Sequence, residues 1–187
     1  MAKKIKITRK RHYKPHAEYL HAANVHIQHY EEEIGGHFYS LMSSYLLSAF
    51  AFEAYMNYIG PKVAPQWSEF KYARVPVKIS HICVCLGIDM DSSKPPFQTI
   101  SELFSFRNKM AHAHDEEITK VTYAHEDHYQ KELYEEPRPS SFDRMSQQDA
   151  KKCLIEVRAA ITLLNSKLKE PDDFPLSQDG WEGCASG

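Results

Sequence analysis

An arginine and a histidine suited to phosphate chemistry lie within one short segment, Arg107-Asn108-Lys109-Met110-Ala111-His112. The guanidinium of Arg107 offers a fixed fork of donors to phosphate oxygens and stays charged. The imidazole of His112 is a group that can accept or donate a proton in catalysis. On a helix, Asn108 and His112 share a face, whereas Arg107 must reach around the axis to act on the same group. This segment is therefore the leading candidate for a site that binds an anionic phosphate and transfers a proton.

The residues before this segment predict the helix that positions it. A helix over 99–112 is expected to open with a capping box of Thr99 and Glu102. Its apolar stripe repeats every three or four residues and comprises Ile100, Leu103 and Phe104. The next inward position is Arg107, so a cation is expected where the pattern predicts core.

Glu53 is the only acidic residue between Ile34 and Ser68, on a helix that is otherwise apolar. An unpaired buried carboxylate is costly, so Glu53 needs a partner, and Arg107 is the natural candidate. Two roles remain open for this pair. It ties two core helices together, or it also holds the guanidinium toward a phosphate.

Apolar periodicity predicts about five helices, over residues 15–34, 37–59, 75–86, 99–112 and 146–168. The second is apolar on every side, which indicates a central helix or a subunit interface. The last begins with a capping box of Ser146 and Asp149. The predicted fold class is therefore all-α, an up-and-down helical bundle with no sheet larger than a minor hairpin. Residues 115–139 are expected to form a surface segment, with a short strand possible over 118–123.

Length and charge predict three parts. The 187 residues, 42% of them hydrophobic, suffice for one core, which we assign to a single domain over 16–170. Net charge is −2, but residues 1–15 hold seven cations and no acid, so the remaining chain carries −9. This basic N-terminal arm either binds a polyanion such as RNA or is a solvated tail. Residues 171–187 are expected to be an irregular C-terminal tail.

Several other classes are disfavoured. The four cysteines lack the C-x-x-C pairs of a zinc or redox site. The uncharged run Ile34–Phe52 contains two glycines and four serines, which indicates a buried helix and no membrane association. No secretory signal is visible, because the basic start is followed by no apolar segment, so a cytoplasmic location is expected.

The segment from Arg107 to His112 resembles the R-N-x-x-x-H motif of the HEPN superfamily (higher eukaryotes and prokaryotes nucleotide-binding domain). The order of elements over about 38–168 is similar as well: a long apolar helix carrying Phe52-Glu53-Ala54-Tyr55-Met56-Asn57, a middle helix, a proline-containing loop, the motif helix and a closing amphipathic helix. The resemblance implies an all-α homodimer that cleaves RNA without a metal or other cofactor, in a toxin or phage-defence role. It also implies a composite site with Arg107 and His112 from both protomers and Asn108 orienting one of them.

One position departs from a subgroup of that superfamily. Toxins paired with a nucleotidyltransferase antitoxin often carry tyrosine two residues after the motif histidine, and here that residue is His114. His114 supplies a second imidazole or marks the solvated end of the helix, and an antitoxin or other defence-system partner is a separate expectation. Candidate RNA contacts are the cations Lys109, Lys10 and Arg11.

Two alternatives remain. One is a non-catalytic HEPN dimer scaffold that binds RNA, nucleotide or protein, with Tyr123, Tyr129 and Tyr134 available for stacking on bases. The other is a metal-dependent hydrolase. Its ligands would come from one short His-rich stretch: His112, His114, Asp115, His125, Asp127 and His128.

Overall fold

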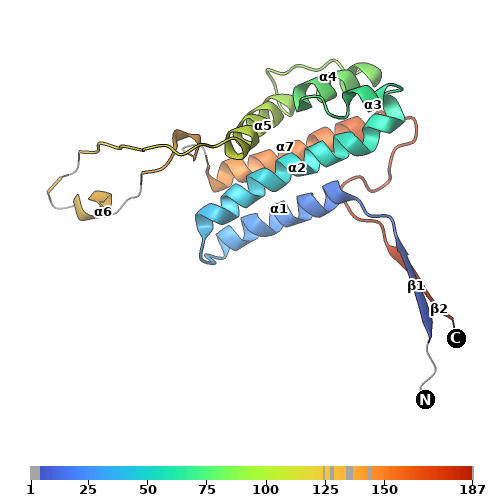
Figure 1. The fold of residues 1–187 in the computed structure, drawn as a ribbon, viewed down its shortest axis with the longest axis horizontal. Helices are drawn as coiled ribbons and strands as arrows, with labels where there is room; N and C mark the ends of the chain where they lie inside the picture. The colour runs from blue at the N-terminus through green and yellow to red at the C-terminus, as the bar shows by residue number, and fades with distance from the viewer. Residues whose placement is uncertain (1–4, 124, 127–128, 134–136, 143–144, 187) are drawn as a thin grey trace.

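The computed structural model of the protein describes residues 5–186 except 124, 127–128, 134–136 and 143–144. It is mostly helical, which confirms the predicted all-α bundle of about five helices (Figure 1). The elements in chain order are β1 (Lys6–Arg11), α1 (Pro15–Glu31), α2 (His37–Val63), α3 (Trp67–Phe70), α4 (Val75–Cys85), α5 (Phe97–Ala111), α6 (Tyr129–Leu133), the 3-10 turn η1 (Ser140–Phe142), α7 (Gln147–Ser166) and β2 (Trp181–Ser186).

Helix α2 is the centre of the bundle. It contacts α1, α3, α4, α5 and α7. Helices α1 and α5 each contact α7 as well (Figure 1). Its largest apolar side chains include four that are fully buried, Phe52, Tyr55, Met56 and Ile59. Burial of such side chains supplies most of the driving force for folding. The interpretation of this helix as central is therefore confirmed.

The predicted end of α2 at Gly60-Pro61 is wrong, because the helix continues to Val63. Pro61 occupies the last turn, where a single missing backbone donor is tolerated, and the amide of Ala64 still bonds to the carbonyl of Gly60 at 2.9 Å. Gly60 has a packing role here. A Cβ at this position would lie 2.3 Å from Trp67 Cε2, so only glycine lets the indole pack on the helix.

Two other helix boundaries differ from those predicted. Helix α1 ends at Glu31, and Ile34, the expected last residue of this helix, is 46% exposed because the chain has already turned away. Helix α5 begins at Phe97, so Thr99 lies inside the first turn and is buried, and no capping box forms with Glu102. The rigid Pro95-Pro96 pair sets the start of this helix in place of a side-chain cap.

Other predicted signals are confirmed. The hydroxyl of Ser146 accepts from the amide of Asp149 at 3.0 Å and caps α7. Gly87 takes φ +66° directly after α4, as a helix-ending glycine should. Residues 112–123 lead away from the bundle (Figure 1), and Val121 and Tyr123 are 72% and 95% exposed. No strand occurs over 118–123. Tyr134 lies outside the described residues.

The two chain ends form structure that the sequence did not predict. Strands β1 and β2 pair antiparallel, with Lys6 opposite Ser186 and Arg11 opposite Trp181. We call this two-stranded element the terminal ribbon; it projects away from the bundle (Figure 1). The expected irregular tail is therefore wrong for residues 181–186, and residues 6–11 are a strand. Strand pairing between segments so distant in sequence leaves no local signal.

A polar cluster around one buried lysine joins the ribbon to the bundle. Lys14 is 2% exposed, and its Nζ lies 2.7 Å from Asp172 Oδ2 and 2.7 Å from Asp179 Oδ1. The side-chain amide of Gln178 bonds to both backbone polar groups of Lys14. His12 Nδ1 lies 2.9 Å from Asp179 Oδ2. We call these five residues the ribbon anchor. Because Lys14 is buried and paired within it, this lysine of the predicted basic arm is not available to bind a partner.

Acidification is expected to destabilise the fold through two histidines of α1: His16, which is buried next to this anchor, and His26, which is half-buried further along the helix. Burial lowers the pKa of His16, and burial also lowers the pKa of His26. Because the unfolded chain then binds protons more readily than the folded one, the stability these groups contribute is present above pH 6.5 and is lost as pH falls below it. Thermal melts from pH 7.5 to 5 should show falling Tm. His16→Gln should flatten that slope, and an unchanged slope in both His16→Gln and His26→Gln would contradict the assignment.

The carboxylates of the anchor extend the same trend to lower pH. Burial raises the pKa of Asp172, but the hydrogen bond and charge of Lys14 outweigh this and hold it below its ordinary value. The hydrogen bonds from Lys14 and His12 likewise lower the pKa of Asp179. The stability that these two carboxylates contribute is present above about pH 3.9 and is lost below it.

No helix among the described residues has the length and apolar character needed to span a membrane.

Candidate active site

The predicted pair between Glu53 and Arg107 is present where α5 crosses α2. Arg107 Nη2 donates to Glu53 Oε2 at 3.1 Å, and the guanidinium lies 5.8 Å from the centre of the Phe50 ring. The two side chains are 29% and 23% exposed, respectively, so the pair lies at the surface and not in the core as expected. The apolar stripe of α5 ends at Phe104. From the next turn of the helix, the long side chain of Arg107 extends to the rim of α2, where Glu53 lies.

Lys78 of α4 completes this cluster, and sequence reasoning missed it. Its Nζ lies 3.4 Å from Glu53 Oε1 and 3.3 Å from Asn57 Oδ1, and its side chain is only 4% exposed. One carboxylate thus faces two cations, which leaves an excess of one positive charge at the rim of α2. Lys78 adjoins the inward stripe of α4, and a cation at such a position was the signal that could have found it.

Asn108 connects Arg107 to the end of the helix. Its Oδ1 accepts from Arg107 Nη1 at 3.0 Å, and its backbone carbonyl accepts from the amide of His112 at 3.1 Å. His112 is the C-cap of α5 and is exposed, as is His114. Within the described part of the chain, the His112 ring makes no hydrogen bond or ion pair. One chain therefore holds Arg107 and Asn108 together and leaves the motif imidazole open to solvent.

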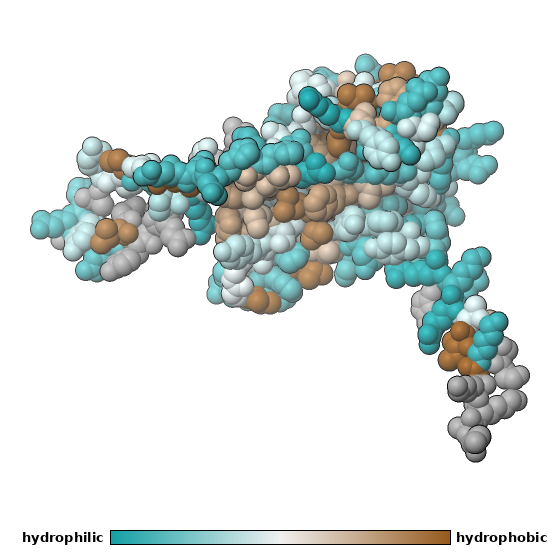
Figure 2. All heavy atoms as spheres, viewed as in Figure 1, coloured by the Kyte–Doolittle hydropathy of each residue, from teal (hydrophilic) through white to brown (hydrophobic). Residues whose placement is uncertain are grey.

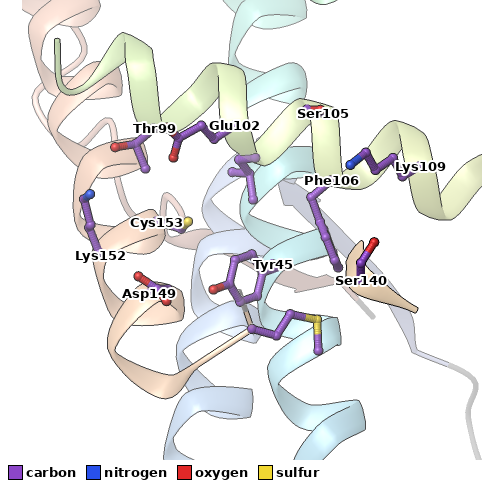
Figure 3. Close-up of a pocket in the computed structure, with 12 residues that line it drawn as sticks. Tyr45, Thr99, Glu102, Ser105, Phe106, Lys109, Ser140, Asp149, Lys152 and Cys153 are labelled. Carbon is purple, nitrogen blue, oxygen red and sulfur yellow. The ribbon is translucent and has the colours of Figure 1, made fainter. Parts of the chain in front are cut away.

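The three cations predicted to bind RNA do not share one surface. Lys109 lines a pocket of about 620 Å³ between α2, α5 and the start of α7 (Figure 3). Lys10 and Arg11 belong to β1 in the terminal ribbon. Among the described residues of the predicted site, Arg107 contacts both Asn108 and Glu53, so these three residues carry the candidate phosphate site and His112 lies at the end of the same helix.

The pocket offers a different chemical environment. Its walls are apolar where Tyr45, Leu103 and Phe106 line it, and its rim carries two lysines and two acids whose charges balance (Figure 3). Burial raises the pKa of Cys153 to about 12, so this thiol stays protonated and is a poor nucleophile at neutral pH. A balanced rim has no preference for phosphate, in contrast to the Glu53 cluster with its extra cation.

The described residues do not form the ligand cluster that the metal-dependent hydrolase alternative requires. Among the described residues, no three His, Cys, Asp or Glu side chains are placed to hold one metal ion. Two of the residues in that hypothesis, Asp127 and His128, lie outside the described residues. Cys83 and Cys153 are buried thiols, whereas Cys85 and Cys184 are exposed.

Replacing Glu53 by glutamine is expected to lower the free energy of unfolding by about 1–3 kcal/mol, because it leaves the buried Lys78 ammonium and Arg107 without a counter-charge. Urea unfolding by circular dichroism measures this. Adding Lys78→Met to Glu53→Gln should recover part of the loss.

The matched control for Glu53→Gln is Glu102→Gln on α5. Glu102 is exposed, and its Oε1 accepts a hydrogen bond from Gln98 at 3.3 Å. The control should change stability by no more than about 0.5 kcal/mol. Equal stability of the two single variants would show that the Glu53 cluster contributes nothing to the fold.

Comparisons with known proteins add no relative to this picture. No protein-family model, no curated protein and no solved structure matches the chain.

Proposed function

We propose that the protein is a metal-independent endoribonuclease of HEPN type, acting as a homodimer in a toxin or phage-defence role. The observation that carries the proposal is the cluster at the end of α5, where Glu53 holds a surface arginine beside an excess positive charge supplied by Lys78. A positioned guanidinium at a rim with surplus charge suits a phosphate. The motif resemblance assigns the remaining roles, and an antitoxin or other defence-system partner belongs to the same proposal.

The chemistry needs a base, an acid and a cation. One His112 accepts the proton of the ribose 2′-hydroxyl, whose oxygen attacks phosphorus. A second His112 donates a proton to the 5′-oxygen as the P–O bond breaks, and Arg107 stabilises the negative charge on the non-bridging oxygens. The products are a 2′,3′-cyclic phosphate and a free 5′-hydroxyl. Asn108 holds the Arg107 side chain through its amide oxygen, and Glu53 holds it from the other side.

A single chain supplies one His112, so the reaction as written requires two copies. The outward face of α2 provides a surface for them, because Tyr39 and Phe50 on that face are 67% and 38% exposed. Figure 2 shows apolar side chains gathered in the middle of the same view, over α2. Phe50 also contacts the Arg107 guanidinium. A second copy seated there would cover apolar surface and bring two motif ends toward one another.

The experiment measures mass and cleavage together. Wild-type protein at micromolar concentration should sediment at about twice the 21.6 kDa chain mass and cleave single-stranded RNA in EDTA. Phe50→Glu should give a folded monomer that no longer cleaves, whereas Phe174→Glu, at an exposed phenylalanine of the C-terminal segment, should remain dimeric and active. A monomer that cleaves at the wild-type rate would contradict the composite site. RNA binding without cleavage would favour the scaffold alternative.

A further inference from the structure

We propose that the terminal ribbon is a rigid nucleic-acid contact that grips the phosphate backbone of a double-helical segment, separate from the Arg107 site. The inference rests on the pairing of the two chain ends and on their charge, and binding is expected whether or not the protein cleaves RNA. Its ligand is the phosphate backbone of a duplex.

The charge of the ribbon distinguishes it from the rest of the protein. All six residues of β1 are exposed, and four of them are cations, Lys6, Arg9, Lys10 and Arg11. Strand β2 adds a single acid, Glu182. The chain beyond residue 15 carries −9. A polyanion is therefore attracted to the ribbon and repelled by the body, which fixes the direction of its approach.

The register separates the cations into two faces. Side chains alternate along a strand, so Arg9 and Arg11 share one face and Lys6 and Lys10 the other. Lys10 is directly opposite Glu182, which reduces the charge of its face, whereas Arg9 is opposite Gly183, which has no side chain to cover it. The two arginines are separated by about 7 Å along the strand. They form the face that we expect to contact phosphates.

Among the described residues, Arg11 contacts the carboxylate of Glu18 and the ring of Tyr13. Its Nη2 lies 3.7 Å from Glu18 Oε2, with both side chains nearly half exposed, and its guanidinium lies 5.6 Å from the Tyr13 ring centre. Exposed pairs of this kind are weak and screened by salt. A phosphate can therefore replace Glu18 at small cost.

The ribbon anchor gives the ribbon a fixed direction. An isolated two-stranded ribbon is only marginally stable in water. Here the buried Lys14 with Asp172 and Asp179 fixes its base, and His16 Nε2 bonds to the carbonyl of Pro175 at 3.0 Å in the segment that leads to β2. A basic element held in one orientation loses less conformational entropy on binding than a flexible tail does.

The dimensions suit a duplex. Six residues per strand give a length of about 20 Å, and two-stranded ribbons fit the major groove of B-form DNA. The corresponding groove of A-form RNA is too narrow for base reading, so contacts there are to the phosphates at its edges. We therefore expect binding with little sequence preference and a strong dependence on salt.

The test measures binding by fluorescence anisotropy in the His112→Ala background, so that cleavage cannot interfere. Three probes of the same sequence are used: a 16-base-pair RNA duplex, the corresponding DNA duplex and the single-stranded RNA. Arg9→Gln with Arg11→Gln should weaken duplex binding about tenfold or more and reduce the slope of log K against log salt by about 1.8. The matched control, Arg158→Gln with Lys167→Gln, removes the same charge from α7 and the residue after it and should change affinity less than twofold.

One further double variant tests whether the charge alone is needed. Arg9→Lys with Arg11→Lys retains the charge and should retain most of the affinity, which separates a lost contact from a lost strand. Equal weakening in the control pair, unchanged affinity in the glutamine pair, or preference for the single strand over both duplexes would each overturn the proposal. Cleavage of a dinucleotide too short to reach the ribbon should be unaffected by the ribbon variants, so failure of the ribonuclease proposal is seen separately.

Discussion

Replacing His112 by alanine is expected to lower the rate of RNA cleavage by about 10²–10⁴-fold, the usual contribution of a positioned acid or base. The fold should be unaffected, because His112 is an exposed C-cap and only its backbone amide takes part in a hydrogen bond of the helix. Single-turnover cleavage of a labelled RNA gives the rate, and a thermal melt gives the stability. A rate lowered by about 10²–10⁴-fold with an unchanged Tm is the predicted combination.

The control for this variant is His125→Ala. His125 is exposed and belongs to the His-rich stretch of the metal alternative, so its replacement should leave cleavage in EDTA unchanged if the ribonuclease proposal holds. The alternative predicts the reverse pattern. A wild-type rate in His112→Ala together with a loss in His125→Ala that zinc or manganese modulates would transfer the function to the metal site.

Replacing Lys14 by methionine should have the largest effect on stability, about 2–4 kcal/mol, because it removes a buried ammonium and leaves the largely buried carboxylate of Asp172, which is 14% exposed, without its cation. Lys14 is 2% exposed and lies 2.7 Å from both Asp172 and Asp179. Burial alone would lower the pKa of Lys14, but the two aspartates raise it above its ordinary value, so the ammonium is charged at neutral pH. Urea unfolding measures the loss.

The ribbon should separate from the bundle in the Lys14→Met variant, and limited proteolysis should cut earlier within 171–186 than in the wild type. Lys10→Met is the matched control, because Lys10 is an exposed lysine of the adjacent strand. It should change stability by no more than about 0.5 kcal/mol. If both variants unfold at the same urea concentration, the anchor does not hold the ribbon.

The sequence predicted what depends on local patterns. The buried stripe of α5, comprising Ile100, Leu103 and Phe104, follows from spacing alone, and the pair of Glu53 with Arg107 follows from the cost of an unpaired carboxylate in an apolar helix. The signals that failed are instructive. Thr99 and Glu102 have the spacing of a capping box, but the preceding prolines start α5 two residues earlier.

What the sequence did not predict depends on residues far apart in the chain. The partners of Lys14 lie about 160 residues away, and the pairing of β1 with β2 joins the two chain ends. Lys78 was missed because a lysine beside an apolar stripe is usually solvated, and only the position of Glu53 on α2 shows that its charge is needed. Periodicity reports which face is buried and does not report which distant side chain covers it.

The most direct test of the ribonuclease proposal is the chemistry of the ends left on cleaved RNA. Mass spectrometry of products formed in EDTA should find 2′,3′-cyclic phosphate and 5′-hydroxyl ends, because the 2′-hydroxyl is the proposed nucleophile. An RNA with 2′-deoxyribose at the scissile position should stay intact, and Arg107→Ala should yield no products. Ends carrying a 3′-hydroxyl and a 5′-phosphate, or cleavage that appears only after zinc or manganese is added, would contradict the account.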